Sequence, residues 1–204
     1  MTTRFTGMLL AATAAAALAT PAFAQPAPAP EDVQKIFDAG RYQEVVDKTP
    51  AEAPPDAQYR RGLAHRKLNQ NDPAKEDFSR LAGAGEAWAA VGQSANLLID
   101  GNLDGALEAA RKGVAAGGEL AQAHYQLGLV LDARNENADA ANAFARAVEL
   151  QPQMAYAHYM AGMSFYKAKR VDKMANYFDS FLKLAPMAPE RPAVQSIMKT
   201  LKGR

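Results

Sequence analysis

A pattern of small and large residues occurs twice in succession in the second half of the chain. In residues 121–152 it runs at helical spacing, breaks at Asn135–Asn137 and resumes up to Pro152. The positions 34 residues further on keep the same physical character, so that Gly128 and Phe144 are followed by Gly162 and Phe178. A hairpin of two such short helices cannot bury its apolar face alone and must stack on copies of itself. The sequence therefore predicts an all-α array of helix-turn-helix repeats.

Each repeat needs small residues where its helices approach and large ones where space is left. Gly128 and Ala140 are small enough for close backbone approach, and Phe144 is large enough to fill the wedge between one hairpin and the next. The residues expected to pack the repeats are His124, Leu127, Gly128, Ala140, Phe144, Ala147, Pro152, His158, Gly162, Phe165, Phe178 and Pro186.

These residues resemble the tetratricopeptide repeat (TPR) family, whose signature has Leu-Gly and an aromatic in the first helix, then Ala, Phe and Pro. His124 and His158 stand where the family usually has Trp, so we expect them to be buried and hydrogen-bonded and not to bind a metal. The resemblance implies a right-handed α-solenoid whose first helices line a concave groove for peptides or protein segments. It implies neither catalysis nor a cofactor.

The resemblance divides the chain into consecutive units. We expect TPR-like repeats over residues 31–188, at approximately 31–54, 55–86, 87–120, 121–154 and 155–188, followed by a capping helix in 189–204. The unit 31–54 is degenerate. In the next two units Arg61 replaces the expected Leu, and polar Gln93 and Ser94 interrupt the packing positions.

The N-terminus has the form of a secretory signal peptide. A cationic head ending at Arg4 precedes the uncharged, Ala-rich run from Met8 to Thr20 and the small residues Ala22 and Ala24. We expect cleavage after residue 24, a Pro/Ala-rich linker in 25–30, a periplasmic location with secretion as second choice, and no integral membrane segment after cleavage. An uncleaved anchor is the alternative, although the run is short for a bilayer. The chain has no Cys, which excludes a lipoprotein attachment and disulfides.

Charge gives no sign of a nucleic-acid partner. Removal of residues 1–24 takes away Arg4 and no acid, which leaves 22 bases and 22 acids. The charges are uneven, because residues 31–58 hold seven acids and three bases whereas 167–204 hold nine bases and three acids. The basic end either steers an acidic partner or anionic envelope surface, or complements helix dipoles.

A second stripe on the first helices is rich in Tyr, which favours binding because its ring offers apolar area and its hydroxyl stays polar. The alternative is that these side chains pack between repeats. The candidate partner-binding groove consists of Tyr59, Arg66, Trp88, Val91, Gln122, Tyr125, Leu129, Asp132, Tyr156, Tyr159, Met163, Tyr166 and Arg170.

The sequence carries no motif of a catalytic nucleophile, a phosphate loop or a zinc site. We therefore expect a non-catalytic interaction or scaffold module of the bacterial cell envelope that binds a segment of another envelope protein. Two alternatives stay open, which are self-association as a structural protein and binding of envelope glycan to the Tyr-lined groove.

Overall fold

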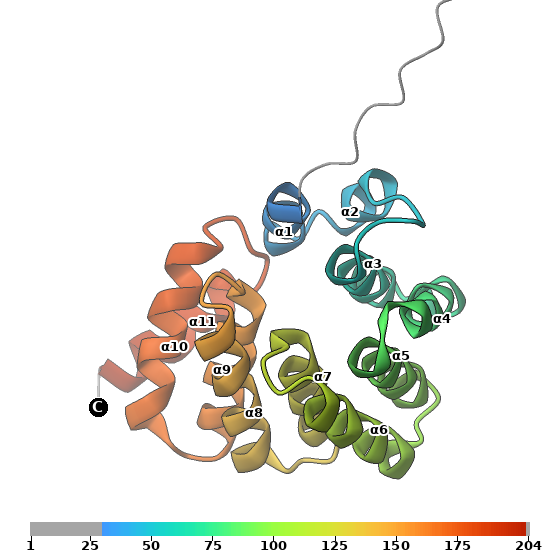
Figure 1. Ribbon diagram of the computed structural model, residues 1–204. Helices are drawn as coiled ribbons and strands as arrows, with labels where there is room; N and C mark the ends of the chain where they lie inside the picture. The colour runs from blue at the N-terminus through green and yellow to red at the C-terminus, as the bar shows by residue number, and fades with distance from the viewer. Residues whose placement is uncertain (1–29, 203–204) are drawn as a thin grey trace, which may run out of the picture.

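The computed structural model describes residues 30–202, and over this range the chain is helical with no β-strand. The expected signal peptide and all of the linker except Pro30 lie outside the described residues. The helices are α1 (Pro30–Asp38), α2 (Tyr42–Lys48), α3 (Pro55–Lys67), α4 (Asn71–Arg80), α5 (Glu86–Ile99), α6 (Leu103–Ala116), α7 (Ala121–Ala133), α8 (Asn137–Leu150), α9 (Ala155–Lys167), α10 (Val171–Leu184) and α11 (Arg191–Lys202), with a 3₁₀ turn, η1 (Leu81–Ala84), before α5. Figure 1 shows them as successive antiparallel pairs.

The same turn joins the two helices of every pair. Its central residue has a positive φ, which is 61° at Asn135. There the amide of Glu136 donates to the carbonyl of Leu131 at 2.9 Å and the amide of Asn135 donates to Asp132 at 3.0 Å, the two bonds of a Schellman motif. The equivalent residues are Gly40, Asn69, Gly101 and Lys169. Gly and Asn adopt this conformation readily, whereas Lys169 adopts it against its preference.

A glycine of the first helix packs against a phenylalanine of the second in the hairpins α3–α4, α7–α8 and α9–α10. A Cβ atom added to Gly128 would lie 2.6 Å from the Phe144 ring, and one added to Gly162 would lie 2.5 Å from Phe178. Phe144 therefore fills space inside its own hairpin, whereas the sequence had placed it between hairpins. Because Gly128 has no side chain, it leaves space on its helix for the aromatic ring of Phe144.

The pair α5–α6 uses a hydrogen bond in place of this contact. Ser94 is fully buried, and its hydroxyl donates to the carbonyl of Ala106 on α6 at 2.9 Å. The polar residue that weakened the sequence pattern thus has a partner, and the helices still pack closely.

The array curves so far that its beginning meets its end. In Figure 1 the blue helix α1 lies between α3 and the orange to red helices α9–α11. A Cβ added to Gly40, in the turn after α1, would lie 2.7 Å from Pro189, in the segment before α11. The first helices α3, α5, α7 and α9 therefore surround a largely filled centre, and α4, α6, α8 and α10 form the outer layer.

Helix α11 covers the last repeat. Val194 and Met198 are buried, while Ser196 and Lys199 on its other side are exposed. This two-sided character matches a helix that ends a solenoid. Between residues 30 and 202 none of the helices combines the length and the apolar character that crossing a bilayer requires.

Candidate functional site

The predicted groove residues lie on the inner helices but differ widely in exposure. Tyr59, Val91, Gln122, Tyr125 and Tyr156 are buried. Arg66, Trp88, Leu129, Asp132, Tyr159 and Met163 are half-buried, and Tyr166 and Arg170 are exposed. In this conformation the buried group has no surface to offer a partner. Of the others, Arg66, Leu129, Asp132, Met163 and Tyr166 lie in the C-terminal halves of α3, α7 and α9, and Arg170 follows α9, whereas Trp88 lies in the first turn of α5 and Tyr159 in the middle of α9.

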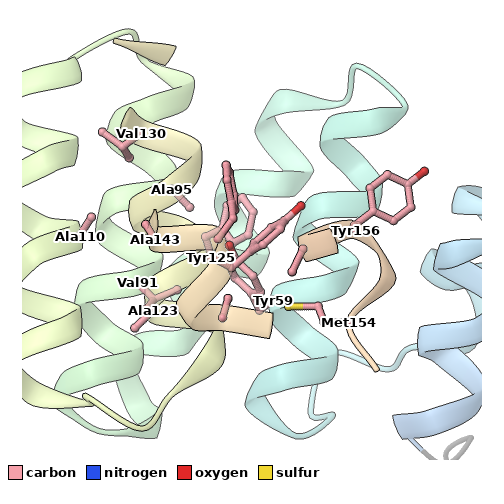
Figure 2. Close-up of a cluster of buried hydrophobic side chains, with 14 of the residues drawn as sticks. Tyr59, Val91, Ala95, Ala110, Ala123, Tyr125, Val130, Ala143, Met154 and Tyr156 are labelled. Atoms are coloured by element: carbon pink, nitrogen blue, oxygen red, sulfur yellow. The ribbon is translucent and has the colours of Figure 1, made fainter. Parts of the chain in front are cut away.

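The buried tyrosines belong to a connected interior. The Tyr59 hydroxyl donates to Gln126 Oε1 at 2.8 Å, and Gln126 Nε2 donates to the Ser94 hydroxyl at 3.2 Å. Figure 2 shows Tyr59 and Tyr125 together at the centre of the cluster, with Tyr156 on the side of the blue N-terminal helices. Because α3, α5 and α7 are linked through polar atoms that no water reaches, this part of the inner stripe holds the repeats together.

The hairpin α1–α2 covers the rest of the inner stripe. The Phe37 ring meets the Tyr156 ring edge-on, with centroids 5.1 Å apart. The Tyr156 hydroxyl lies 2.6 Å from that of Tyr42 and donates to Glu190 Oε2 at 2.7 Å. Since the single Tyr156 proton goes to the carboxylate, Tyr42 is the donor to Tyr156. Lys67 Nζ completes the cluster, 3.3 Å from Glu190 and 4.9 Å from the Tyr156 ring centroid.

Beside this seam the inner surface stays open. Lys167 Nζ of α9 lies 2.6 Å from Asp132 Oδ1 of α7 and joins the ends of the two helices. Tyr166, at 42% exposure, is one of the few large apolar side chains on the described surface. A half-open cavity of about 230 Å³ lies further inward, between α1, α3, α7 and α9. The open inner surface, defined here as Arg66, Leu129, Asp132, Met163, Tyr166, Lys167 and Arg170, therefore mixes aromatic, aliphatic and charged groups.

Burial sets the protonation of the interior. It raises the pKa of Tyr59, Tyr125 and Tyr156, so these hydroxyls stay protonated, and those of Tyr59 and Tyr156 act as hydrogen-bond donors. Burial also raises the pKa of Asp38, at the end of α1, to about 6, although the amide of Gln34 and the charge of Arg60 lower it. The contact between α1 and α3 thus contains a carboxyl group that titrates near neutral pH.

His124 and His158 each form a hydrogen bond with the turn that precedes their helix. His124 Nε2 pairs with the carbonyl of Gly118, and His158 Nε2 pairs with that of Pro152, each at 2.9 Å. His158 is buried, which lowers its pKa, whereas His124 is half-buried. Across the described residues no three His, Cys, Asp or Glu side chains are grouped so that they could hold a metal ion.

One buried ionic cluster was missed by the sequence reasoning. Arg61, which stands at an expected Leu position, lies 3.2 Å from Asp77 Oδ2, and His65 and Arg80 approach the same carboxylate at 3.5 and 2.8 Å. Asp77 is 1% exposed, and its burial raises its pKa against the influence of these cations. The available signal was the spacing, because Asp77 follows Arg61 at the same distance as Phe144 follows Gly128.

Repeated helix pairs that share one turn geometry define the class of protein as a helical-repeat solenoid. Tetratricopeptide repeat models match residues 56–83, 121–154 and 156–186. The chain contains tetratricopeptide repeats and has a TPR-type solenoid fold, which confirms the resemblance seen in the sequence. No sequence among curated proteins matches it.

Solved structures of similar fold belong to the same repeat class. YrrB, described as a TPR protein with an unusual peptide-binding site, superposes with a TM-score of 0.50 at 18% identity, over 83% of this chain and 88% of YrrB. A crystal structure of MamA gives 0.48 at 20% identity, over 72% and 85% of the two chains. A MamA 41-end structure from Desulfovibrio magneticus RS-1 gives 0.47 at 22% identity, over 76% and 91%. Identities this low show the fold alone.

Proposed function

We propose that this protein is a non-catalytic interaction or scaffold module of the bacterial cell envelope. In this proposal a signal peptide in residues 1–24 exports the chain to the periplasm. The folded array then binds a segment of another envelope protein on its open inner surface. TPR solenoids bind peptides and proteins in general, and YrrB is an example that is described as having a peptide-binding site.

The observation that carries the proposal is the composition of the open inner surface. Tyr166 is exposed near the end of α9, Arg170 is exposed in the turn that follows it, and Met163 of α9 is half-buried. Tyr and Arg dominate the energetics of protein interfaces, because they combine a large contact area with a polar end. Met163 also packs against the core of the last repeat, whereas the Tyr166 side chain is 42% exposed.

The remaining charged groups serve packing and support a non-catalytic role. Asp77 is surrounded by Arg61, Arg80 and His65 inside the α3–α4 hairpin, and Glu190 is occupied by Tyr156 and Lys67. Neither carboxylate is left free beside a nucleophile, which is the arrangement that acid–base catalysis would need.

The direct test is affinity capture from envelope extracts with the chain lacking residues 1–24. The bait variant is Tyr166→Ala/Arg170→Ala, whose side chains are exposed, so that folding stays intact. The matched control is Asn142→Ala/Lys112→Ala on the outer helices, where both residues are also exposed. We expect at least one protein to be captured by the unchanged bait and by the control bait but not by the inner-surface variant. Identical capture by all three baits would contradict binding at this surface.

Export has a separate readout. A C-terminally tagged chain should be recovered from the periplasmic fraction with Gln25 as its first residue. Recovery in the membrane fraction with residues 1–24 retained would contradict the proposed route and support an uncleaved anchor.

A further inference from the structure

The half-open cavity of about 230 Å³ has apolar walls and lies beneath the open inner surface. Phe37, Leu63, Leu129 and Met160 contribute side chains from all four helices that surround it. The ring of Tyr156 also faces it, while the hydroxyl of that residue is occupied by Tyr42 and Glu190. The apolar part of a ligand bound here would be shielded from water by these side chains. Burial of apolar surface is the main source of affinity in small-molecule sites.

Two hydrogen-bond donors at this cavity have no partner. The Tyr125 hydroxyl makes no hydrogen bond within residues 30–202, although Tyr125 is 5% exposed and lines the cavity. The Arg66 guanidinium, also in the lining, makes neither an ion pair nor a hydrogen bond with any described residue. Both groups line the cavity and are free to donate a hydrogen bond to a bound acceptor.

The polar groups in the lining are therefore donors, and their charge is positive. Lys67 adds a second cation at the exposed edge, where it is paired with Glu190. Burial keeps the Tyr125 hydroxyl protonated by raising its pKa. The negative charges of Asp38 and Glu190 act in the same direction, and the Arg66 charge acts in the opposite direction. A guanidinium and a phenol match the two oxygens of a carboxylate, and they disfavour an amine.

The cavity volume limits the size of the ligand. It exceeds the roughly 150 Å³ of an apolar cavity that accepts benzene and is below the roughly 300–1,000 Å³ of drug-sized pockets. An acid of about ten non-hydrogen atoms, such as octanoate or 3-phenylpropanoate, fits this range.

We propose that this cavity binds a small free carboxylic acid with an apolar body. Arg66 and the Tyr125 hydroxyl hold the carboxylate. The body lies against Phe37, Leu129 and Met160, at the seam where the first hairpin meets the inner helices. This site shares Arg66 and Leu129 with the open inner surface, whereas Tyr125, Phe37 and Met160 belong to the cavity alone.

The test is a titration of the chain lacking residues 1–24 with octanoate, followed by NMR and calorimetry. 1-Octanol and octylamine serve as probes with the same body and a different head group. We expect saturable one-to-one binding of octanoate, at least tenfold tighter than that of either control. Absence of saturable binding, or equal binding of all three probes, would overturn the proposal.

Variants locate the site. Arg66→Gln and Tyr125→Phe keep the size of each side chain and should each weaken octanoate binding at least tenfold. Arg111→Gln and Tyr177→Phe are the matched controls, since Arg111 is exposed on α6 and Tyr177 lies on α10, away from the cavity lining. Circular dichroism verifies that each variant folds, and Met160→Phe, which fills the cavity, gives a second route to the same loss. Unchanged affinity in Arg66→Gln and Met160→Phe would place octanoate elsewhere and overturn the assignment.

A peptide probe tests whether the ligand is a small free acid or the C-terminal carboxylate of a partner protein. Acetyl-Ala-Ala-Phe carries the same carboxylate and ring as 3-phenylpropanoate. Binding of the free acid supports the proposal, whereas binding of the peptide alone would overturn it and assign the cavity to the partner surface.

Discussion

The hydroxyl groups of Tyr42 and Tyr156 lie 2.6 Å apart although 114 residues separate them in the chain. This contact brings the first hairpin onto the last full repeat and converts a curved array into a closed one. It also explains why Tyr156 is buried at 3% exposure on a face that a TPR groove would leave open. The closed arrangement creates both the cavity at the seam and the limited extent of the open inner surface.

Removal of the Tyr156 hydroxyl should weaken this closure. Tyr156→Phe loses the bonds to Tyr42 and Glu190, and we expect the free energy of unfolding to fall by about 1–3 kcal/mol. Urea unfolding of Tyr156→Phe, Tyr42→Phe and the double variant measures the coupling. Tyr166→Phe, at an exposed position, is the control. Strictly additive losses in the double variant would show that the two hydroxyls do not interact.

A larger side chain at Gly128 should disrupt its hairpin. Gly128→Leu would direct its side chain into the Phe144 ring, and overpacking of this kind costs about 1–3 kcal/mol. Gly83→Ala is the matched control, because a Cβ there meets no atom within 4 Å and φ is not positive. Thermal denaturation should separate the two variants by several degrees. Equal melting temperatures would be inconsistent with the Gly–Phe contact.

Replacement of Lys169 should stabilise the protein. Lys169 occupies the left-handed position of the last Schellman turn with φ of 59°, where the equivalent turns have Gly or Asn. We expect Lys169→Gly to raise the free energy of unfolding by about 1 kcal/mol. Lys173→Gly, inside α10, should lower it by about the same amount. A destabilised Lys169→Gly protein would show that the Lys169 side chain makes a contribution larger than the backbone strain.

The docking of α1 should depend on pH through Asp38. Its folded pKa of about 6 lies above the ordinary value of 3.8, so the folded state binds the proton more tightly. The resulting stabilisation is complete below about pH 4 and is lost as pH rises through 6, with a difference on the order of 2–3 kcal/mol. Hydrogen exchange of α1 amides, corrected for intrinsic rates, should show greater protection at pH 5 than at pH 7.5.

The Asp38→Asn variant supplies the control for this pH effect. It should keep its α1 protection at pH 7.5 and lose the pH dependence. The lowered pKa of His158 acts in the opposite direction, since burial favours its neutral form and stability falls below pH 6.5, but both proteins share this effect. The same pH dependence in wild type and variant would exclude Asp38 as its source.

Local packing could be predicted from the sequence because its determinants recur at fixed spacing. The small residue at Gly128 and a hydrogen-bond partner for His124 were expected from the repeat pattern. Phe144 was expected between hairpins and instead contacts Gly128 inside its own hairpin. These interactions involve residues that helical periodicity brings together. The helix pairs, their turns and the capping helix follow from the same information.

The contact between the beginning and the end of the array could not be predicted from local sequence patterns. Whether Tyr42 reaches Tyr156 depends on small rotations accumulated over the intervening repeats, and no local pattern records their sum. The stripe that contains Tyr59 and Tyr125 is buried, and this burial depends on contacts between residues far apart in sequence. From the sequence, Arg61 was interpreted only as a departure from the expected Leu. Its ion pair with Asp77 on the following helix was therefore missed.

The most direct test of the closed array is an engineered disulfide between the first turn and the segment before α11. A Cβ at position 40 lies 3.9 Å from the Pro189 Cβ, within the roughly 3.5–4.5 Å that a disulfide requires. The natural chain has no Cys, so Gly40→Cys/Pro189→Cys places the only two thiols, and Gly40→Ser/Pro189→Ser controls for the strain at position 40, where φ is 74°. Under mild oxidation we predict a monomer without free thiols and with a higher melting temperature than its reduced form. Thiols that stay free, or that link only separate molecules, would contradict closure.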